Sequence, residues 1–127
     1  MKILVTGGAG FIGSNFIRMM IKKYSKDIFV CLDSLTYAGN ILNMADFSQR
    51  KNFIFIKGDI RDKEFINRLF KKENFDIVVN FAAETHVDRS FDYPELFYET
   101  NYIGTKNLLD ASINNSVKHF HQVSTDE

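Results

Sequence analysis

The fold is decided by residues 6–13, which read Thr6-Gly7-Gly8-Ala9-Gly10-Phe11-Ile12-Gly13. The short apolar run Lys2–Thr6 predicts a β-strand, and apolar residues then recur at helical spacing up to about Tyr24. Glycines between a strand and a helix let the backbone turn tightly and approach a phosphate closely. The helix that starts near Phe11 directs unpaired N–H groups and its positive dipole end at such a group. This pattern predicts the first unit of a dinucleotide-binding sheet.

Strands and helices alternate along the rest of the chain. Asp62 can cap one helix, and Pro94 suits the first turn of another that runs to about Asn114, whereas Ser34–Asn52 has too weak a period for a helix. Further strands are predicted at Ile28–Leu32, Phe53–Lys57, Asp76–Phe81 and Val117–Val123. We therefore predict an α/β fold over residues 1–127: a Rossmann-type parallel sheet in the order 3-2-1-4-5, with helices on both faces.

The composition argues against several classes of function. Lys plus Arg and Asp plus Glu each number 16, and the net charge of +0 argues against a nucleic-acid partner or a charged membrane surface. No apolar run is long enough for a signal peptide or a membrane span, so we expect a cytoplasmic protein. Cys31 lies in an apolar run, which predicts a buried side chain rather than a nucleophile. His119 and His121 have no acids or cysteines nearby, so we predict no metal site.

Polar residues follow each predicted strand, and ligands of such sheets bind beyond the carboxyl ends of the strands. Asp33 follows Gly13 at the spacing of about 20 residues at which a carboxylate accepts hydrogen bonds from the adenosine ribose. The same carboxylate would repel a 2′-phosphate, and no arginine stands beside it to reverse that preference. The sequence therefore predicts NAD rather than NADP. Asp59-Ile60 can border the adenine, although a strand-end turn with a helix-capping role fits its spacing nearly as well.

The last predicted strand delivers Thr125-Asp126-Glu127. Adjacent acids at a strand end are either a solvated turn or a pair of titratable groups that divide acid and base roles between them. The residues alone leave both interpretations open.

Four stretches together resemble dTDP-glucose 4,6-dehydratases, which are extended short-chain dehydrogenases/reductases. They are Thr6–Gly13, Leu35-Thr36-Tyr37-Ala38-Gly39-Asn40, Ala82-Ala83-Glu84-Thr85-His86-Val87-Asp88-Arg89-Ser90 and Ser124-Thr125-Asp126-Glu127. Many extended members share the first stretch, whereas the last two in combination are close to specific for the dehydratases. The resemblance implies a reaction in which hydride leaves C4 of the sugar, water is eliminated across C5 and C6, and hydride returns to C6.

The resemblance also implies roles for individual residues. Asp126 would protonate the departing C6 hydroxyl, Glu127 would remove the C5 proton, and Thr125 would bind near the C4 hydroxyl. Thr85 would touch the substrate, dTDP-glucose, and it stands where the family usually has serine; ordinary packing remains an alternative for it. Spacing and resemblance together predict these cofactor-binding residues: Gly7, Gly10, Phe11, Ile12, Gly13, Asp33, Ser34, Leu35, Thr36, Asp59, Ile60, Ala82, Ala83, Glu84 and Thr100.

The family uses a Tyr-x-x-x-Lys pair on a helix after the fifth strand. The literal match from Tyr102 to Lys106 lies before that strand, so we predict that Tyr102 is a packing residue and Lys106 a solvated one. We expect the chain to be the N-terminal part of a homodimeric enzyme, without the later strands and the C-terminal substrate domain, and inactive alone. Two alternatives stay open: a sugar-nucleotide epimerase or decarboxylase of the same superfamily, and a non-catalytic NAD-sensing module.

Overall fold

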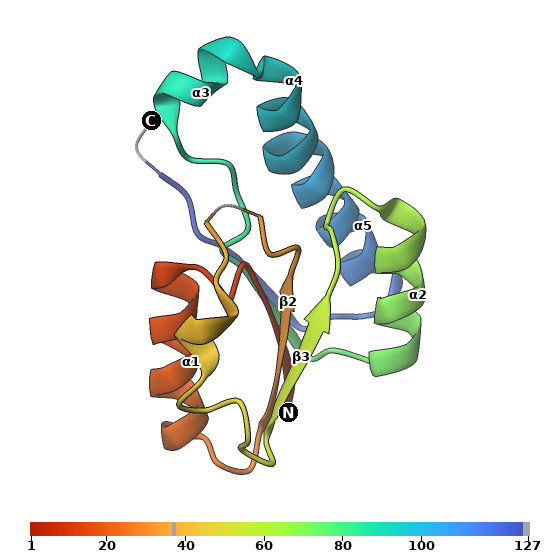
Figure 1. The fold of residues 1–127 in the computed structure, drawn as a ribbon. Coiled ribbons are helices and arrows are strands. Elements are labelled where there is room, and N and C mark those ends of the chain that lie inside the picture. Colours follow the sequence, from red (N-terminus) through yellow and green to blue (C-terminus); the bar gives the residue numbers. More distant parts are fainter. Residues whose placement is uncertain (37, 126–127) are drawn as a thin grey trace.

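The computed structural model describes residues 1–36 and 38–125, which form a five-stranded parallel sheet between two layers of helices (Figure 1). The strands are β1 (Lys2–Thr6), β2 (Ile28–Asp33), β3 (Phe53–Lys57), β4 (Ile77–Asn80) and β5 (His119–Gln122). Their order in the sheet is β3-β2-β1-β4-β5, and every neighbouring pair is parallel. The fold class and the strand order predicted from the sequence are confirmed.

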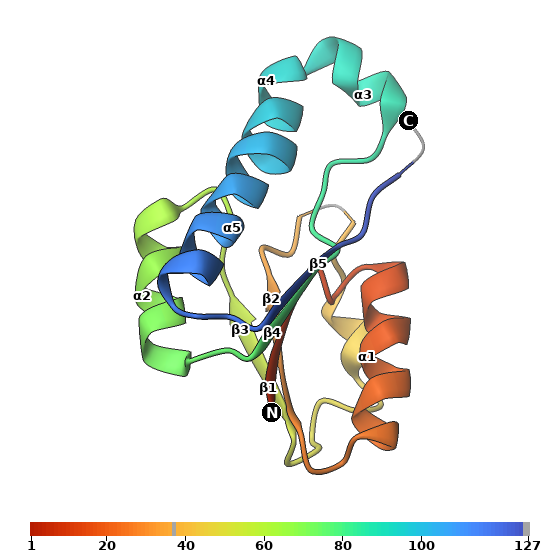
Figure 2. The same ribbon diagram turned by 180° about the vertical axis from the view of Figure 1, so that it is seen from behind.

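Helices cover both faces of the sheet. They are α1 (Phe11–Lys23), η1 (Ile41–Met44), α2 (Lys63–Glu73), α3 (Val87–Asp92), α4 (Pro94–Phe97), η2 (Tyr98–Gly104) and α5 (Thr105–Asn114). Figure 2 shows α1 on one side of the sheet, with α2 and α5 on the other. Asp62 caps α2 as predicted, because its side chain accepts a hydrogen bond from the Phe65 N–H at 3.1 Å. Asn74 ends the same helix in the left-handed conformation.

The core has two parts, one on each face of the sheet. Successive side chains of β1 point to opposite faces, so Ile3 and Val5 pack on the side of α1 while Leu4 packs on the side of α2 and α5. All three side chains are buried. Burial on both faces explains why these strands read as nearly continuous apolar runs in the sequence.

The region between β4 and β5 differs from the prediction. The helix predicted from Pro94 to about Asn114 is helical over that range, but Tyr98–Gly104 has the wider π-helical winding. π-Helical segments are rare in proteins, and those that occur are often found at functional sites. Val87–Asp92 forms an additional helix, α3, which has no buried residue and therefore no apolar period by which the sequence could reveal it.

Cys31 of β2 is fully buried, with its Sγ atom 3.7 Å from Sδ of Met44. Burial, followed by the nearby charge of Asp33, raises the pKa of the Cys31 thiol to about 12. Because only the thiolate reacts, a thiol reagent at pH 8 should label the folded protein at least about 100-fold more slowly than the protein in concentrated guanidinium chloride. Absorbance of the released thiolate reporter measures both rates. Equal rates would contradict the buried position of Cys31.

Candidate cofactor-binding site

A cavity of about 350 Å³ lies at the carboxyl ends of the strands. The predicted residues that border it are Gly7, Gly10, Asp33, Ser34, Thr36, Asp59, Ile60, Ala82, Ala83, Glu84 and Thr100. Phe11, Ile12, Gly13 and Leu35 were predicted with them but do not line this cavity. The cavity also has lining residues that the prediction missed, namely Leu32, Ala38, Gly39, Gly58, Arg61, Phe81, Arg89 and Leu96. Most of the predicted set therefore converges on one space.

The glycines of the turn after β1 have two different roles: some allow close backbone packing, and one leaves space for a ligand. Gly7 has φ 68°, and a Cβ atom on it would lie 2.7 Å from the backbone nitrogen of Ala82. A Cβ atom on Gly13 would lie 2.4 Å from the carbonyl oxygen of Gly7, so α1 packs directly onto the turn. A Cβ atom on Gly10 would meet nothing nearer than 3.4 Å. Gly7 and Gly13 allow backbone segments to approach each other, whereas Gly10 leaves space at the cavity wall.

Helix α1 begins at this turn without a side-chain cap. Gly10 is its N-cap residue in an extended conformation, and the first turn contains no acidic side chain. The Ser14 N–H donates to the Gly10 carbonyl at 3.0 Å, which leaves the earlier N–H groups of the helix available to a ligand. Phe11 and Ile12 expose large side chains beside them. This helix end can bind an anion such as a pyrophosphate.

Asp33 is held by the backbone on both of its carboxylate oxygens. Oδ2 accepts from the Ala9 N–H at 2.9 Å, and Oδ1 accepts from the Leu35 N–H at 2.8 Å. Leu35 has φ 57°, which turns the chain back toward the carboxylate. A Cβ atom on Gly39 would lie 2.7 Å from Oδ1, so the following loop also packs against this group. A carboxylate has about four lone-pair positions, so Asp33 can still accept hydrogen bonds from hydroxyl groups of a ligand.

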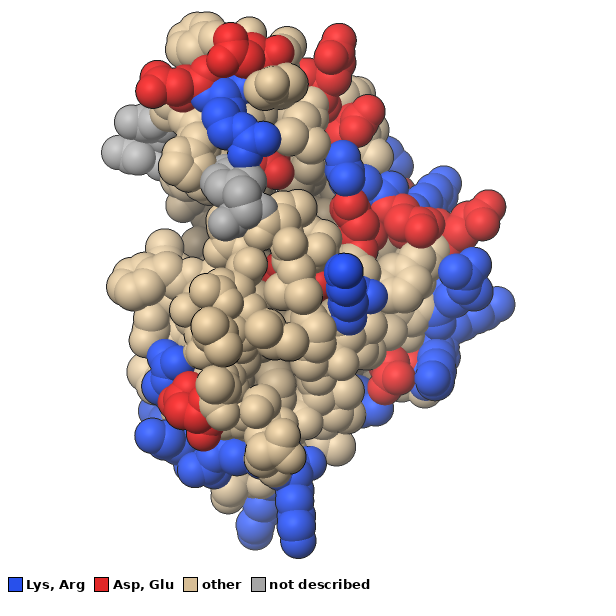
Figure 3. All heavy atoms as spheres, viewed as in Figure 1, with Lys and Arg blue, Asp and Glu red and all other residues tan. Residues whose placement is uncertain are grey.

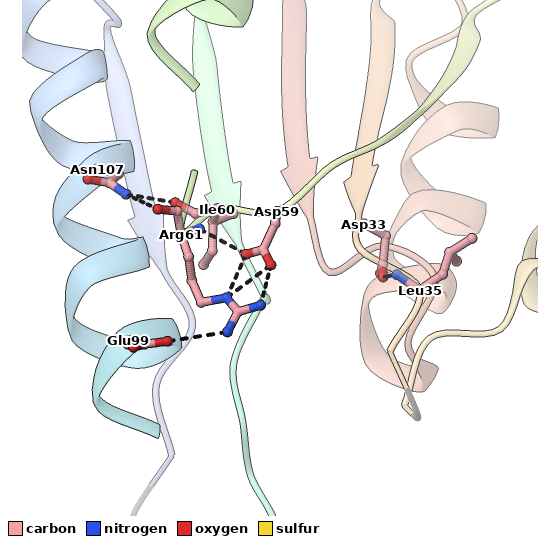
Figure 4. A network of polar contacts seen from close by, with 7 residues as sticks. All are labelled: Asp33, Leu35, Asp59, Ile60, Arg61, Glu99 and Asn107. Atoms are coloured by element: carbon pink, nitrogen blue, oxygen red, sulfur yellow. Dashed lines mark hydrogen bonds and ion pairs between the residues drawn. The ribbon is translucent and has the colours of Figure 1, made fainter. Parts of the chain in front are cut away.

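Asp59 lies at the cavity after β3 and is paired with Arg61 (Figure 4). The capping role that its spacing allowed belongs instead to Asp62. Burial raises the pKa of Asp59, but the hydrogen bonds and the charge of Arg61 outweigh that effect and hold the pKa below its usual value. Asp59 is therefore an ionised acceptor next to the cavity. Ile60 beside it is buried.

Glu84 has a buried side-chain oxygen that accepts no hydrogen bond within the described residues. Its residue is only 8% exposed, and Oε2 accepts no hydrogen bond from the described part of the chain. Asn101 of η2 fixes the backbone of Glu84: its Oδ1 accepts from the Glu84 N–H at 2.8 Å and its Nδ2 donates to the Glu84 carbonyl at 3.0 Å. A buried oxygen without a donor costs free energy, so this position fits a ligand that carries O–H or N–H groups.

The predicted catalytic residues are only partly described. Thr125 is exposed after β5, and Thr85 is exposed in the loop before α3. The chain after β5 continues toward that loop (Figures 1 and 2), and the Val123 N–H donates to the Asn80 carbonyl at 3.1 Å. Asp126 and Glu127 lie outside the described residues.

The prediction that Tyr102 is a packing residue is wrong. Its side chain is 57% exposed and stacks on the ring of Tyr98, with the ring centroids 5.2 Å apart. Lys106 is exposed as predicted and pairs with Asp110 at 2.6 Å, one helical turn further on. Neither Tyr102 nor Lys106 borders the cavity. The prediction rested on the place of this segment before the fifth strand, which does not indicate whether Tyr102 faces the core or the solvent.

Sequence reasoning missed a polar network inside the sheet. The Thr6 hydroxyl donates to Oδ1 of Asn80, and Nδ2 of Asn80 donates to Oε1 of Gln122 at 2.8 Å. These side chains join β1, β4 and β5 at the end that borders the cavity. The sequence signal for this network is a polar residue at the end of each of these three strands, namely Thr6, Asn80 and Gln122.

Charge is distributed without a dominant sign around the site. On the face seen in Figure 3, basic and acidic side chains lie mainly around an uncharged central area. Among residues 1–36 and 38–125, no group of three or more His, Cys, Asp or Glu side chains is arranged as metal ligands would be. In the same residues no helix has the length and apolar character that crossing a membrane requires.

Comparison with protein families gives a match over residues 4–127 to the family described as GDP-mannose 4,6 dehydratase. The chain is 50% identical over 127 residues to the low-salt glycan biosynthesis protein Agl12 of Haloferax volcanii, covering 100% of this chain and 40% of that protein. It is 46% identical to dTDP-glucose 4,6-dehydratase 1 of Escherichia coli, covering 100% of this chain and 37% of that protein. The chain thus spans well under half the length of these relatives.

Solved structures show the same similarity. The dTDP-glucose 4,6-dehydratase DesIV of Streptomyces venezuelae, crystallised with NAD and TYD, matches with a TM-score of 0.87 and 44% identity over 94% of this chain and 38% of that one. The UDP-Glc/GlcNAc 4-epimerase of Campylobacter jejuni matches with a TM-score of 0.90 and 34% identity over 98% of this chain and 37% of that one.

Proposed function

The chain belongs to the GDP-mannose 4,6-dehydratase family, and we propose that it is the NAD-binding part of an enzyme that dehydrates dTDP-glucose to dTDP-4-keto-6-deoxyglucose. The observation that carries the proposal is the convergence of the glycine turn, Asp33 and the unpartnered Glu84 oxygen on one cavity. Solved relatives that contain NAD support the choice of cofactor.

When bound, NAD would accept a hydride from the substrate and later return it. In the proposed arrangement the start of α1 binds the pyrophosphate, and Asp33 accepts hydrogen bonds from the adenosine ribose. The adenine would lie beside Asp59 and Ile60, and Thr100 of η2, which lines the same cavity, would contact the cofactor. Backbone contacts hold Asp33 in place before any ligand arrives, so little ordering is required on binding.

The elimination step is assigned to the end of β5. Asp126 would protonate the departing C6 hydroxyl and Glu127 would take the C5 proton, while Thr125 and Thr85 would bind the sugar. This division of roles is what the resemblance to the dehydratases implies, and the position of the motif after β5 is consistent with it. For the complete enzyme, a homodimer in the cytoplasm remains our expectation.

A second candidate is a 4-epimerase, because the match to the Campylobacter enzyme has a TM-score of 0.90. An epimerase needs reversible hydride transfer but no base at C5. The adjacent acids Asp126 and Glu127 therefore favour elimination over epimerisation.

Two measurements test the proposal separately. Calorimetric titration of the 127-residue chain should show binding of NAD; absence of binding would reject the cofactor assignment. The complete enzyme that contains this chain should convert dTDP-glucose into a product lighter by one water, detected by mass spectrometry. Formation of dTDP-galactose without loss of water would instead establish the epimerase.

A further inference from the structure

The glycine turn is held in place by the segment that follows β2. In this segment η1 lies beside α1 (Figures 1 and 2). Asn43 of η1 donates from Nδ2 to the Ala9 carbonyl at 2.8 Å, and the Asn40 N–H donates to the same oxygen at 3.1 Å. A carbonyl oxygen has two lone pairs, so both acceptor positions of Ala9 are used. A residue 34 positions further along the chain thus contacts the middle of the glycine turn.

Ala9 is held at both of its peptide groups. Its N–H donates to Oδ2 of Asp33 at 2.9 Å, and its carbonyl accepts the two hydrogen bonds from the η1 segment. Because a peptide group is planar, the direction of this carbonyl also sets the Gly10 N–H, which donates to the Gly7 carbonyl at 3.2 Å. These contacts determine the direction in which the chain enters α1, and therefore where the unpaired N–H groups of its first turn point.

Arg18 of α1 fixes η1 from the other side. Its Nη2 donates to the Asn43 carbonyl at 2.7 Å and to Oδ1 of Asp46 at 3.0 Å, and its Nε donates to Oδ2 of Asp46 at 2.6 Å. Its Nη1 donates to Oδ1 of Asn15, also on α1, at 2.7 Å. A planar guanidinium with five N–H donors can hold several acceptors in one geometry. The side chain that contacts the turn is therefore anchored to the helix that the turn begins.

Asn43 does not border the cavity, so it can influence a ligand there only through the turn. We propose that Asn43 is a positioning residue: it holds the Ala9 carbonyl so that the first turn of α1 presents its N–H groups to the pyrophosphate of the dinucleotide. The inference rests on the proposed binding of NAD. Donors that are already in place need little ordering on binding, and this raises affinity. Only the part of the ligand that contacts the turn gains from Asn43.

The test compares NAD with adenosine, which lacks the pyrophosphate. Asn43→Leu keeps a side chain of similar volume but removes the donor. Its NAD affinity, measured by calorimetric titration, should be about fivefold or more below that of the unchanged chain. Its adenosine affinity, measured by ligand-observed NMR, should stay within about twofold. Asn67→Leu, at an exposed asparagine of α2 on the opposite face of the sheet, is the matched control and should change neither affinity.

A merely structural role of Asn43 would weaken NAD and adenosine by the same factor, and that result would overturn the inference. NAD binding by Asn43→Leu as tight as that of the unchanged chain would also overturn it, while leaving the cofactor assignment in place. Absence of NAD binding by the unchanged chain would reject both. Thermal unfolding of each variant without ligand, recorded alongside, identifies any general loss of structure.

Discussion

Replacing Gly7 with alanine is expected to destabilise the domain by about 3 kcal/mol or more and to abolish NAD binding. Two effects add. The backbone at Gly7 has φ 68°, which costs a residue with a Cβ atom about 1–2 kcal/mol. The new methyl group would also lie 2.7 Å from the Ala82 nitrogen, and a backbone atom cannot move aside as a side chain can. Denaturant unfolding followed by circular dichroism measures the first loss, and calorimetry measures the second.

Gly10→Ala is the matched control because the same methyl group is added to the same turn at a position where it meets no close backbone atom. Gly10 has φ −75°, which alanine adopts readily, and the nearest atom would lie 3.4 Å away. Its stability should stay within about 0.5 kcal/mol of the unchanged chain, while NAD affinity falls about tenfold or more because Gly10 borders the cavity. A Gly7→Ala protein as stable as Gly10→Ala would show that the turn can be rebuilt without glycine.

The sheet could be predicted because its signals are local. Buried parallel strands read as apolar runs, so β1 and β3 have the predicted bounds, whereas β4 is shorter than the predicted Asp76–Phe81. The position of the cavity could be predicted for a similar reason, because the spacing of glycines within a few residues indicates a phosphate-binding turn.

Contacts between distant residues could not be predicted in the same way. Asn101 is hydrogen-bonded to the backbone of Glu84, 17 residues earlier in the chain, and no local sequence pattern around either residue predicts this contact. Asp59 was predicted to border the adenine, but its ion pair with Arg61 was missed because no local pattern requires an arginine two residues further on. The roles of the predicted site residues stay predictions, and the variants at Gly7 and Asp33 test the parts of the site on which they depend most.

Asp33→Asn should lower NAD affinity about 30-fold or more and remove the preference for NAD over NADP. The carboxylate is expected to bind the ribose hydroxyls with charge-assisted hydrogen bonds, each stronger than a bond to a neutral amide. Without the negative charge, a 2′-phosphate no longer meets repulsion at this position. Titration of both dinucleotides into the variant measures the two effects together, and Asp92→Asn, an exposed acid outside the cavity lining, is the control.

The same substitution also separates ligand binding from the internal role of Asp33. The carboxylate accepts from both the Ala9 and the Leu35 N–H groups, and an asparagine can offer an oxygen to only one of them. The other donor is left facing an amide NH₂ group, so stability should fall by about 1–3 kcal/mol. Saturating NAD should then raise the unfolding temperature of the variant less than that of the unchanged chain. If the variant loses stability but still prefers NAD over NADP, Asp33 organises the turn while another group selects the cofactor.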